Sequence, residues 1–150
     1  MSKQALVSTD QTIFVRDHCL CLAAQRVARS LSRRFDEAFR PIGITSGQFS
    51  ILNALNRPVA PSIASVAQLL AMDRTTLTAN LKPLARDGLV SIAPDQSDKR
   101  ARRVALTAAG SEALARAMPI WTQVHGDIDE ALAETAAGGD MLRAGLAAVA

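Results

Sequence analysis

The residues best able to do chemistry in this chain are basic, and many of them gather in the stretch DQSDKRARRVALT, residues 95–107. From Arg74 to Arg103 the chain carries seven Lys and Arg residues against three Asp residues, whereas from residue 110 onward two Arg residues stand against six Asp and Glu residues. A basic middle followed by an acidic C-terminal part is typical of a protein that meets a polyanion along one side. The alternative is a solvated basic loop that serves only solubility.

Catalytic and metal-binding chemistry find little support in the sequence. There is no Gly-rich phosphate loop and no Ser/His/Asp arrangement in a supporting context, and the chain has only two histidines. His18, Cys19 and Cys21 come nearest to a metal site, but residues 19 and 21 would point about 200° apart on a helix and could not reach one ion. We therefore expect neither an enzyme nor a metal or cofactor.

Helices must position most of these residues. Apolar residues recur at spacings of three and four over residues 20–39, which predicts a long first helix that ends at the following Pro-Ile-Gly. A short second helix is predicted in SGQFSILNAL, with Ser46 as its N-cap and Phe49 facing inward. The stretch NRPVAPS then forms a connection.

The next stretch, SIASVAQLLAMDRTTLTANLKPLARDGLV, predicts two short helices joined by a tight connection, which is the spacing of a helix-turn-helix. Asp73 can cap the second helix, Gly88 can end it in the left-handed conformation, and Pro83 should bend it without ending it. Short hydroxyls and cations occupy its outward side, and these side chains reach bases and phosphates. The DNA-binding residues predicted there are Arg74, Thr75, Thr76, Thr78 and Lys82.

Two strand-like stretches, LVSIAP and RRVALT, follow at once, with DQSDKRA between them as a hairpin tip. A helix-turn-helix followed by a basic hairpin is a winged helix, and the hairpin would lie against phosphate beside the groove that the second helix occupies. The DNA-binding residues predicted at the tip are Asp98, Lys99, Arg100 and Arg102.

The C-terminal part predicts helix-on-helix packing. Thr107 can cap a long helix, and Gly138 and Gly139 separate it from a last short one. An apolar seam with alternating spacings of four and three is formed by Leu114, Met118, Trp121, His125, Ile128 and Leu132. We therefore predict a mainly α fold with a small two-stranded β-wing. Residues 1–150 form one domain, with the winged helix-turn-helix in 45–107 and dimerisation helices in 13–40 and 108–150.

These residues resemble the MarR family of winged-helix transcription regulators. The resemblance rests on VAQLLAMDRTTLTANLKPLARDGLV, on Asp98-Lys-Arg100 and on Leu106-Thr107-x-x-Gly110, and it covers roughly residues 45–115. It implies a homodimer whose recognition helices enter the major groove of a pseudo-palindromic operator. It also implies that Arg100 is the arginine of the wing and that Asp98 orients its guanidinium.

The resemblance further implies a regulator, here a repressor, that releases DNA when it binds a small aromatic or phenolic ligand. By position, the effector-binding residues would be His18, Cys21, Gln25 and Phe49. Cys21 is also similar in position to the reactive cysteine of the peroxide-sensing OhrR branch, which hydrogen-bonds that thiolate with tyrosines, and this chain contains no tyrosine. A thiol-based redox regulator therefore stays open as an alternative, as does a helical protein-interaction module.

The composition also bears on where the protein works. No apolar run approaches the ~18 residues that a membrane span needs. The two cysteines are separated by a single residue and cannot form a disulfide framework. We therefore expect a cytoplasmic protein with no membrane partner.

Overall fold

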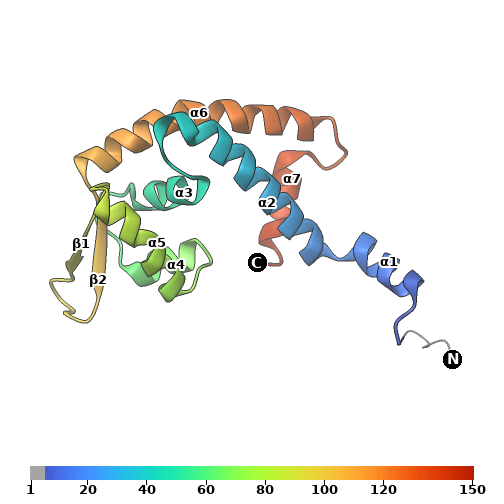
Figure 1. Cartoon of the computed structure of the whole chain (residues 1–150), viewed down its shortest axis with the longest axis horizontal. Helices are drawn as coiled ribbons and strands as arrows, with labels where there is room; N and C mark the ends of the chain where they lie inside the picture. The colour runs from blue at the N-terminus through green and yellow to red at the C-terminus, as the bar shows by residue number, and fades with distance from the viewer. Residues whose placement is uncertain (1–5) are drawn as a thin grey trace. The chain divides into compact units, whose positions relative to one another are not determined.

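The computed structural model describes residues 6–150, and its contacts divide the chain into two compact units, 1–34 and 35–150 (Figure 1). The first unit contains α1 (Thr9–His18) and most of α2 (Leu20–Phe39). The elements that follow α2 are a short 3-10 helix (Arg40–Ile42), α3 (Ser46–Leu55), α4 (Ile63–Leu69), α5 (Arg74–Arg86), β1 (Val90–Pro94), β2 (Arg102–Leu106), α6 (Ala108–Ala133) and α7 (Gly138–Ala147). This architecture confirms the predicted fold class.

The helix predicted over residues 20–39 is α2, and a separate helix, α1, precedes it. The backbone leaves the helical conformation at Cys19, where φ is −75° and ψ is 105°. The Cys19 thiol accepts a hydrogen bond from the Leu22 amide at 3.4 Å, so it occupies an amide that the first turn of α2 would otherwise leave unpaired. The apolar periodicity of residues 20–39 carries no sign of this interruption, because it lies just before the stripe begins.

The core of the second unit lies between α3, α4, α5, the wing and the first half of α6. Leu77, Leu81 and Leu84 are almost completely buried, which confirms the predicted inward side of α5. Phe49 of α3 is buried between Phe39 and Trp121, with ring centroids 5.0 and 6.4 Å away. These three aromatic side chains therefore pack on one another within the chain.

Local hydrogen bonds set where α3 begins. The N-cap is Thr45 and not Ser46: the Thr45 hydroxyl accepts the Gln48 amide at 3.1 Å, and the Gln48 side chain accepts the Thr45 amide at 3.0 Å. The Ser46 amide instead donates to the Asp36 carboxylate of α2 at 2.6 Å. Ser46 was the wrong choice because this capping box requires Gln three residues after the cap, and Gln48 stands three residues after Thr45.

The Leu106-Thr107-x-x-Gly110 stretch locks α6 to the end of the helix-turn-helix. The Thr107 hydroxyl accepts the Gly110 amide at 3.0 Å, as predicted for the cap, and donates to the Gly88 carbonyl at 2.6 Å. A Cβ on Gly110 would lie 1.9 Å from the Leu89 carbonyl oxygen. Only glycine allows α6 to start this close to the preceding backbone.

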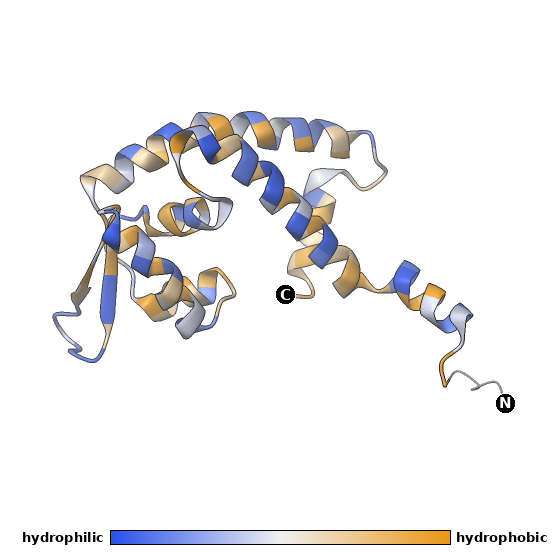
Figure 2. Cartoon of the chain, in the orientation of Figure 1, coloured by the Kyte–Doolittle hydropathy of each residue, from blue (hydrophilic) through white to orange (hydrophobic). Residues whose placement is uncertain are grey.

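The predicted seam of α6 divides into two parts. Leu114 is buried in the chain's own core, whereas Trp121 packs against that core and stays partly exposed. Farther along, Ile128 and Leu132 stay partly exposed, and hydrophobic residues recur on α7 (Figure 2). Within residues 6–150 no helix combines the length and the apolar character needed to cross a membrane.

Candidate nucleic-acid interface

Helix α5, the second helix of the helix-turn-helix, begins with a tightly held first turn. Asp73 accepts the Thr76 amide at 2.8 Å through one carboxylate oxygen and the Thr76 hydroxyl at 2.6 Å through the other, which confirms it as the N-cap. These hydrogen bonds, that from the Thr76 hydroxyl above all, hold the pKa of the Asp73 carboxyl below its usual value. The first turn is thus fixed before any ligand arrives.

The outward side of α5 presents the side chains predicted from the sequence. All five are exposed: Arg74, Thr75, Thr76, Thr78 and Lys82. The Thr78 hydroxyl donates to the Arg74 carbonyl at 2.7 Å, so this threonine, like Thr76, uses its proton within the helix. Toward solvent both therefore offer a methyl group and oxygen lone pairs, which suit thymine methyls and donor groups of bases in the major groove.

The end of α5 also follows the sequence. Pro83 lies inside the helix, which continues to Arg86, so it does not end the helix. Gly88 adopts φ 73°, the left-handed conformation that follows a helix C-terminus. Between α4 and α5 the tight connection includes Ala71 at φ 51°, a conformation that non-glycine residues rarely adopt.

The basic hairpin is a wing of two antiparallel strands, in which Val90 pairs with Leu106 and Pro94 with Arg102. Lys99, Arg100 and Arg102 are exposed at or beside its tip. The predicted role of Asp98 needs correction. Its carboxylate accepts the backbone amide of Arg100 at 2.9 Å and makes no ion pair with the Arg100 guanidinium, which leaves that guanidinium available to solvent.

Two residues that no sequence pattern singled out form an ion pair in the wing. Asp95 is buried and ion-paired with Arg103 of β2. Arg103 also donates to the Ala60 carbonyl at 2.6 Å, in the segment before α4. The spacing Asp-x-Ser was a signal for a turn closed by a carboxylate, but nothing local indicated that Arg103 would be its partner.

The candidate effector residues are divided between the two units. His18, Cys21 and Gln25 lie exposed in the first unit, where the Gln25 side chain donates to the Cys21 thiol at 3.2 Å and accepts from Arg29 at 3.2 Å. Phe49 belongs to the core of the second unit and is 8% exposed. Its ring lies against Phe39 and Trp121, and its role as a wall of an effector pocket stays a prediction.

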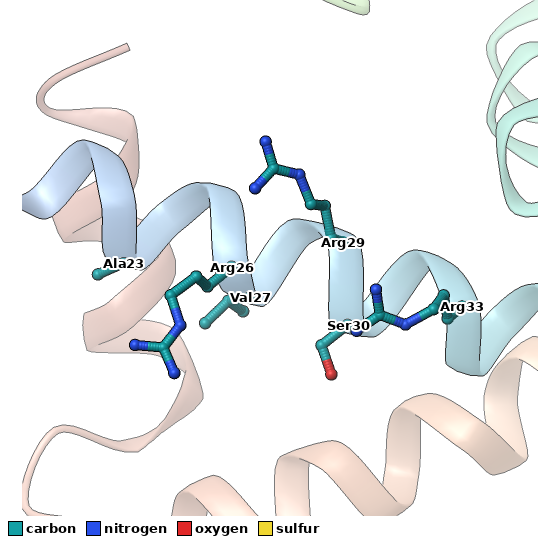
Figure 3. Close-up of a pocket in the computed structure, with 6 residues that line it drawn as sticks. All are labelled: Ala23, Arg26, Val27, Arg29, Ser30 and Arg33. Atoms are coloured by element: carbon teal, nitrogen blue, oxygen red, sulfur yellow. The ribbon is translucent and has the colours of Figure 1, made fainter.

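A surface hollow of about 620 Å³ lies along α2 and begins at Ala23, between the candidate effector residues Cys21 and Gln25, neither of which lines it (Figure 3). Cations dominate it, and its lining residues are Ala23, Arg26, Val27, Arg29, Ser30 and Arg33. The Cys21 thiol is exposed. Among residues 6–150, no three His, Cys, Asp or Glu side chains are grouped in a way that could hold a metal ion.

Known proteins resemble this chain in both sequence and fold. Residues 44–110 match a family model described as a winged helix DNA-binding domain. The transcriptional regulator MosR of M. tuberculosis, in complex with DNA, is 34% identical over 88% of this chain and 93% of its own, with a TM-score of 0.78. A mutant MarR of E. coli complexed with operator DNA is 25% identical over 91% of this chain and 96% of its own, with a TM-score of 0.79.

A third relative is the transcriptional activatory protein BadR of Rhodopseudomonas palustris, which is 34% identical over 86 residues. That match covers 55% of this chain and 49% of BadR, so the chain spans about half the length of this relative. All three relatives are transcription regulators, and none is an enzyme.

Proposed function

The chain belongs to the MarR family of DNA-binding transcription regulators, and we propose that it acts as a homodimer that represses transcription from a pseudo-palindromic operator. The observation that carries the proposal is the combination, in one unit, of a capped helix with an outward side of hydroxyls and cations and a basic wing on a buried anchor. Helix α5 would enter the major groove, and the wing would lie on phosphate or in the minor groove.

The first test separates the contribution of the wing to DNA binding from that of α5. Arg100→Ala should weaken binding to every duplex and lower the slope of log affinity against log salt by about 1, because one phosphate contact is lost. Thr78→Val removes a hydroxyl and should cost about 1–3 kcal/mol on operator while barely changing binding to scrambled DNA. Salt titrations by fluorescence anisotropy, on scrambled duplex and on fragments selected from source genomic DNA, measure both. Arg100→Ala with unchanged affinity and slope would contradict the role of the wing.

The homodimer is supported by the terminal helices. Among the residues described, α1 and α7 bury none of their side chains, and exposed apolar residues on α7 include Leu142 and Leu146. A stripe of this kind is unfavourable in a monomer and is usually covered by another chain. Light scattering at micromolar concentration should report twice the 15.9 kDa of the chain.

Repression is proposed because a bound dimer would occupy at least one turn of duplex and exclude other proteins from it. BadR is named an activatory protein, so whether this chain represses or activates transcription needs its own measurement. A reporter behind a selected operator should become more active when the regulator is deleted. Such a protein works on chromosomal DNA, which places it in the cytoplasm.

We propose a small aromatic or phenolic acid as the effector. The cations around the hollow on α2, including Arg29 beside Gln25, suit a carboxylate or phenolate. A panel of benzoic and phenolic acids should lower the affinity for operator, and Arg29→Ala should reduce that response. If the panel leaves the affinity unchanged, the effector class is wrong.

The thiol-based alternative is favoured by one observation, the exposed Cys21 thiol that accepts a hydrogen bond from Gln25. Peroxide should then abolish DNA binding, and Cys21→Ser should prevent that loss. Unchanged binding after peroxide would dismiss the alternative.

A further inference from the structure

The cations of the wing sit on a loop that is closed around one buried carboxylate. Asp95 is 6% exposed, and no other charged side chain within residues 6–150 is buried. One of its oxygens accepts the Ser97 amide at 2.8 Å, the Ser97 hydroxyl at 2.7 Å and the Asp98 amide at 3.0 Å. The other accepts the Nε–H of Arg103. A burial of this kind is tolerated only when the charge is paired and hydrogen-bonded, as it is here.

Arg103 carries the connection beyond the wing. Its Nη1 donates to the Ala60 carbonyl at 2.6 Å, and Arg103 pairs as an isolated β-bridge with Ser62, the N-cap of α4. The adjacent Val104 amide donates to the Pro61 carbonyl at 3.0 Å. The guanidinium therefore joins the tip of the wing to the segment from which the helix-turn-helix begins.

We propose that Arg103 and Asp95 are positioning residues that fix the wing relative to α5. In this view, which rests on the function proposed above, Arg103 supports DNA affinity through Lys99, Arg100 and Arg102 and not by contacting phosphate. Its Nε and Nη1 donors are already used by the Asp95 carboxylate and the Ala60 carbonyl, although the side chain is 42% exposed. A wing held in one orientation does not lose conformational entropy on binding, which is how preorganisation raises affinity.

Because Asp95 is negatively charged, its replacement distinguishes a positioning role from a simple effect of net charge on DNA binding. Replacing a carboxylate on a DNA-facing element makes that element more positive, and electrostatics alone predicts tighter binding to a polyanion. Loss of the anchor predicts weaker binding. Asp95→Asn keeps the size and one oxygen for the Ser97 and Asp98 amides, so it removes mainly the link to Arg103.

The experiment measures binding of the full-length protein to a random-sequence duplex across a KCl titration. Asp95→Asn and Arg103→Met should each weaken binding about tenfold at low salt and lower the salt slope, as expected when a few phosphate contacts are lost. Asp87→Asn is the matched control, because Asp87 forms an exposed pair with Arg86 at the end of α5. It should bind as well as the wild type or tighter. Equal or tighter binding by Asp95→Asn would overturn the proposal.

Two further variants separate positioning from direct contact. Arg103→Lys keeps the charge but cannot bridge the Asp95 carboxylate and the Ala60 carbonyl together, so it should also weaken binding. If lysine restores full affinity, Arg103 acts by charge alone and the proposal fails. In an Arg100→Ala background the effect of Arg103→Met should shrink, because both act through the wing, whereas strict additivity would indicate an independent phosphate contact.

Amide hydrogen exchange, measured on the same variants in the absence of DNA, tests the closure of the wing directly. The Asp95 amide donates to the Ala101 carbonyl at 3.0 Å and the Ala101 amide to the Asp98 carbonyl at 2.9 Å. Both amides should lose protection in Asp95→Asn and in Arg103→Met while the amides of α5 keep theirs. Unchanged protection would refute the anchor whatever the affinity. If the wild type shows no salt-dependent DNA binding, the proposed function fails, and the exchange data then report on the anchor separately.

Discussion

The winged helix and the terminal helices differ in how completely one chain buries them. All buried hydrophobic side chains of residues 6–150 lie between Phe39 and Ala117, whereas α1 and α7 bury none. The winged helix thus reaches a closed core within one chain. The terminal helices carry apolar residues of the same kind and leave them exposed, so their stability has to come from elsewhere. A substitution should therefore act on folding in the first region and on association in the second.

The largest effect, a loss of stability, is expected in the winged helix at a position where the packing leaves no room for an extra atom. Gly110→Ala would place a methyl group 1.9 Å from the Leu89 carbonyl oxygen, and a backbone atom cannot move away as a flexible side chain can. We expect a loss of about 3 kcal/mol or more in the free energy of unfolding. Urea unfolding should show a lower midpoint at unchanged slope. Wild-type stability in this variant would mean that α6 does not start so close to the end of the helix-turn-helix.

The second effect addresses the open region. Leu142→Asp with Leu146→Asp places two charges one turn apart on the exposed apolar side of α7, where the leucines are 41% and 42% exposed. The dimer should weaken at least about a hundredfold, since charges in a desolvated interface are costly. Sedimentation should report a monomer, while circular dichroism stays that of a helical protein. Ala144→Asp, on the opposite side of α7, is the control and should leave the dimer intact.

The parts of the molecule that the sequence predicted are those governed by local rules. Asp73, the three buried leucines of α5 and Gly88 follow from capping, helical periodicity and the left-handed turn, which depend on residues a few positions apart. Both strands of the wing followed for the same reason. The outward side chains of α5 followed because an outward helical face is defined once the inward one is known.

What escaped prediction depends on residues far apart in the chain. Arg103 acquires its role from the Ala60 carbonyl, 43 positions earlier, and no local pattern encodes that contact. The stacking of Phe49 against Phe39 and Trp121 likewise joins residues that are far apart in the sequence. Cys19 ends one helix and begins another through a thiol, which is not among the residues usually expected at a cap.

A smaller effect, on acid stability, tests the closure of the wing. The hydroxyl of Ser97 and the guanidinium of Arg103 hold the pKa of Asp95 well below its usual value. Because the pKa is lower in the folded state, the carboxylate stabilises the fold fully above the unfolded pKa of about 3.9, and this contribution is lost as pH falls below it. Melting temperatures of the wild type and Asp95→Asn should therefore differ most near neutral pH and converge in acid. A difference that stays constant down to the acid limit would contradict the ionised anchor.

The smallest expected effect is a gain in stability from Gly126→Ala. It compares the two halves of one helix, α6. Gly126 lies in α6, as Gly110 does, but a Cβ there would meet nothing within 4 Å. Alanine in an open helix interior stabilises by roughly 0.5–1 kcal/mol, because glycine loses more backbone entropy on folding. Gly126→Ala should therefore raise the urea midpoint of the monomeric Leu142→Asp, Leu146→Asp protein. The same gain in the dimeric wild type means that Gly126 faces solvent in the assembled protein, whereas a gain confined to the monomer places it under the partner chain. A loss of stability in the monomer would contradict the open surroundings of Gly126, and with them the contrast between a closed first half and an open second half of α6.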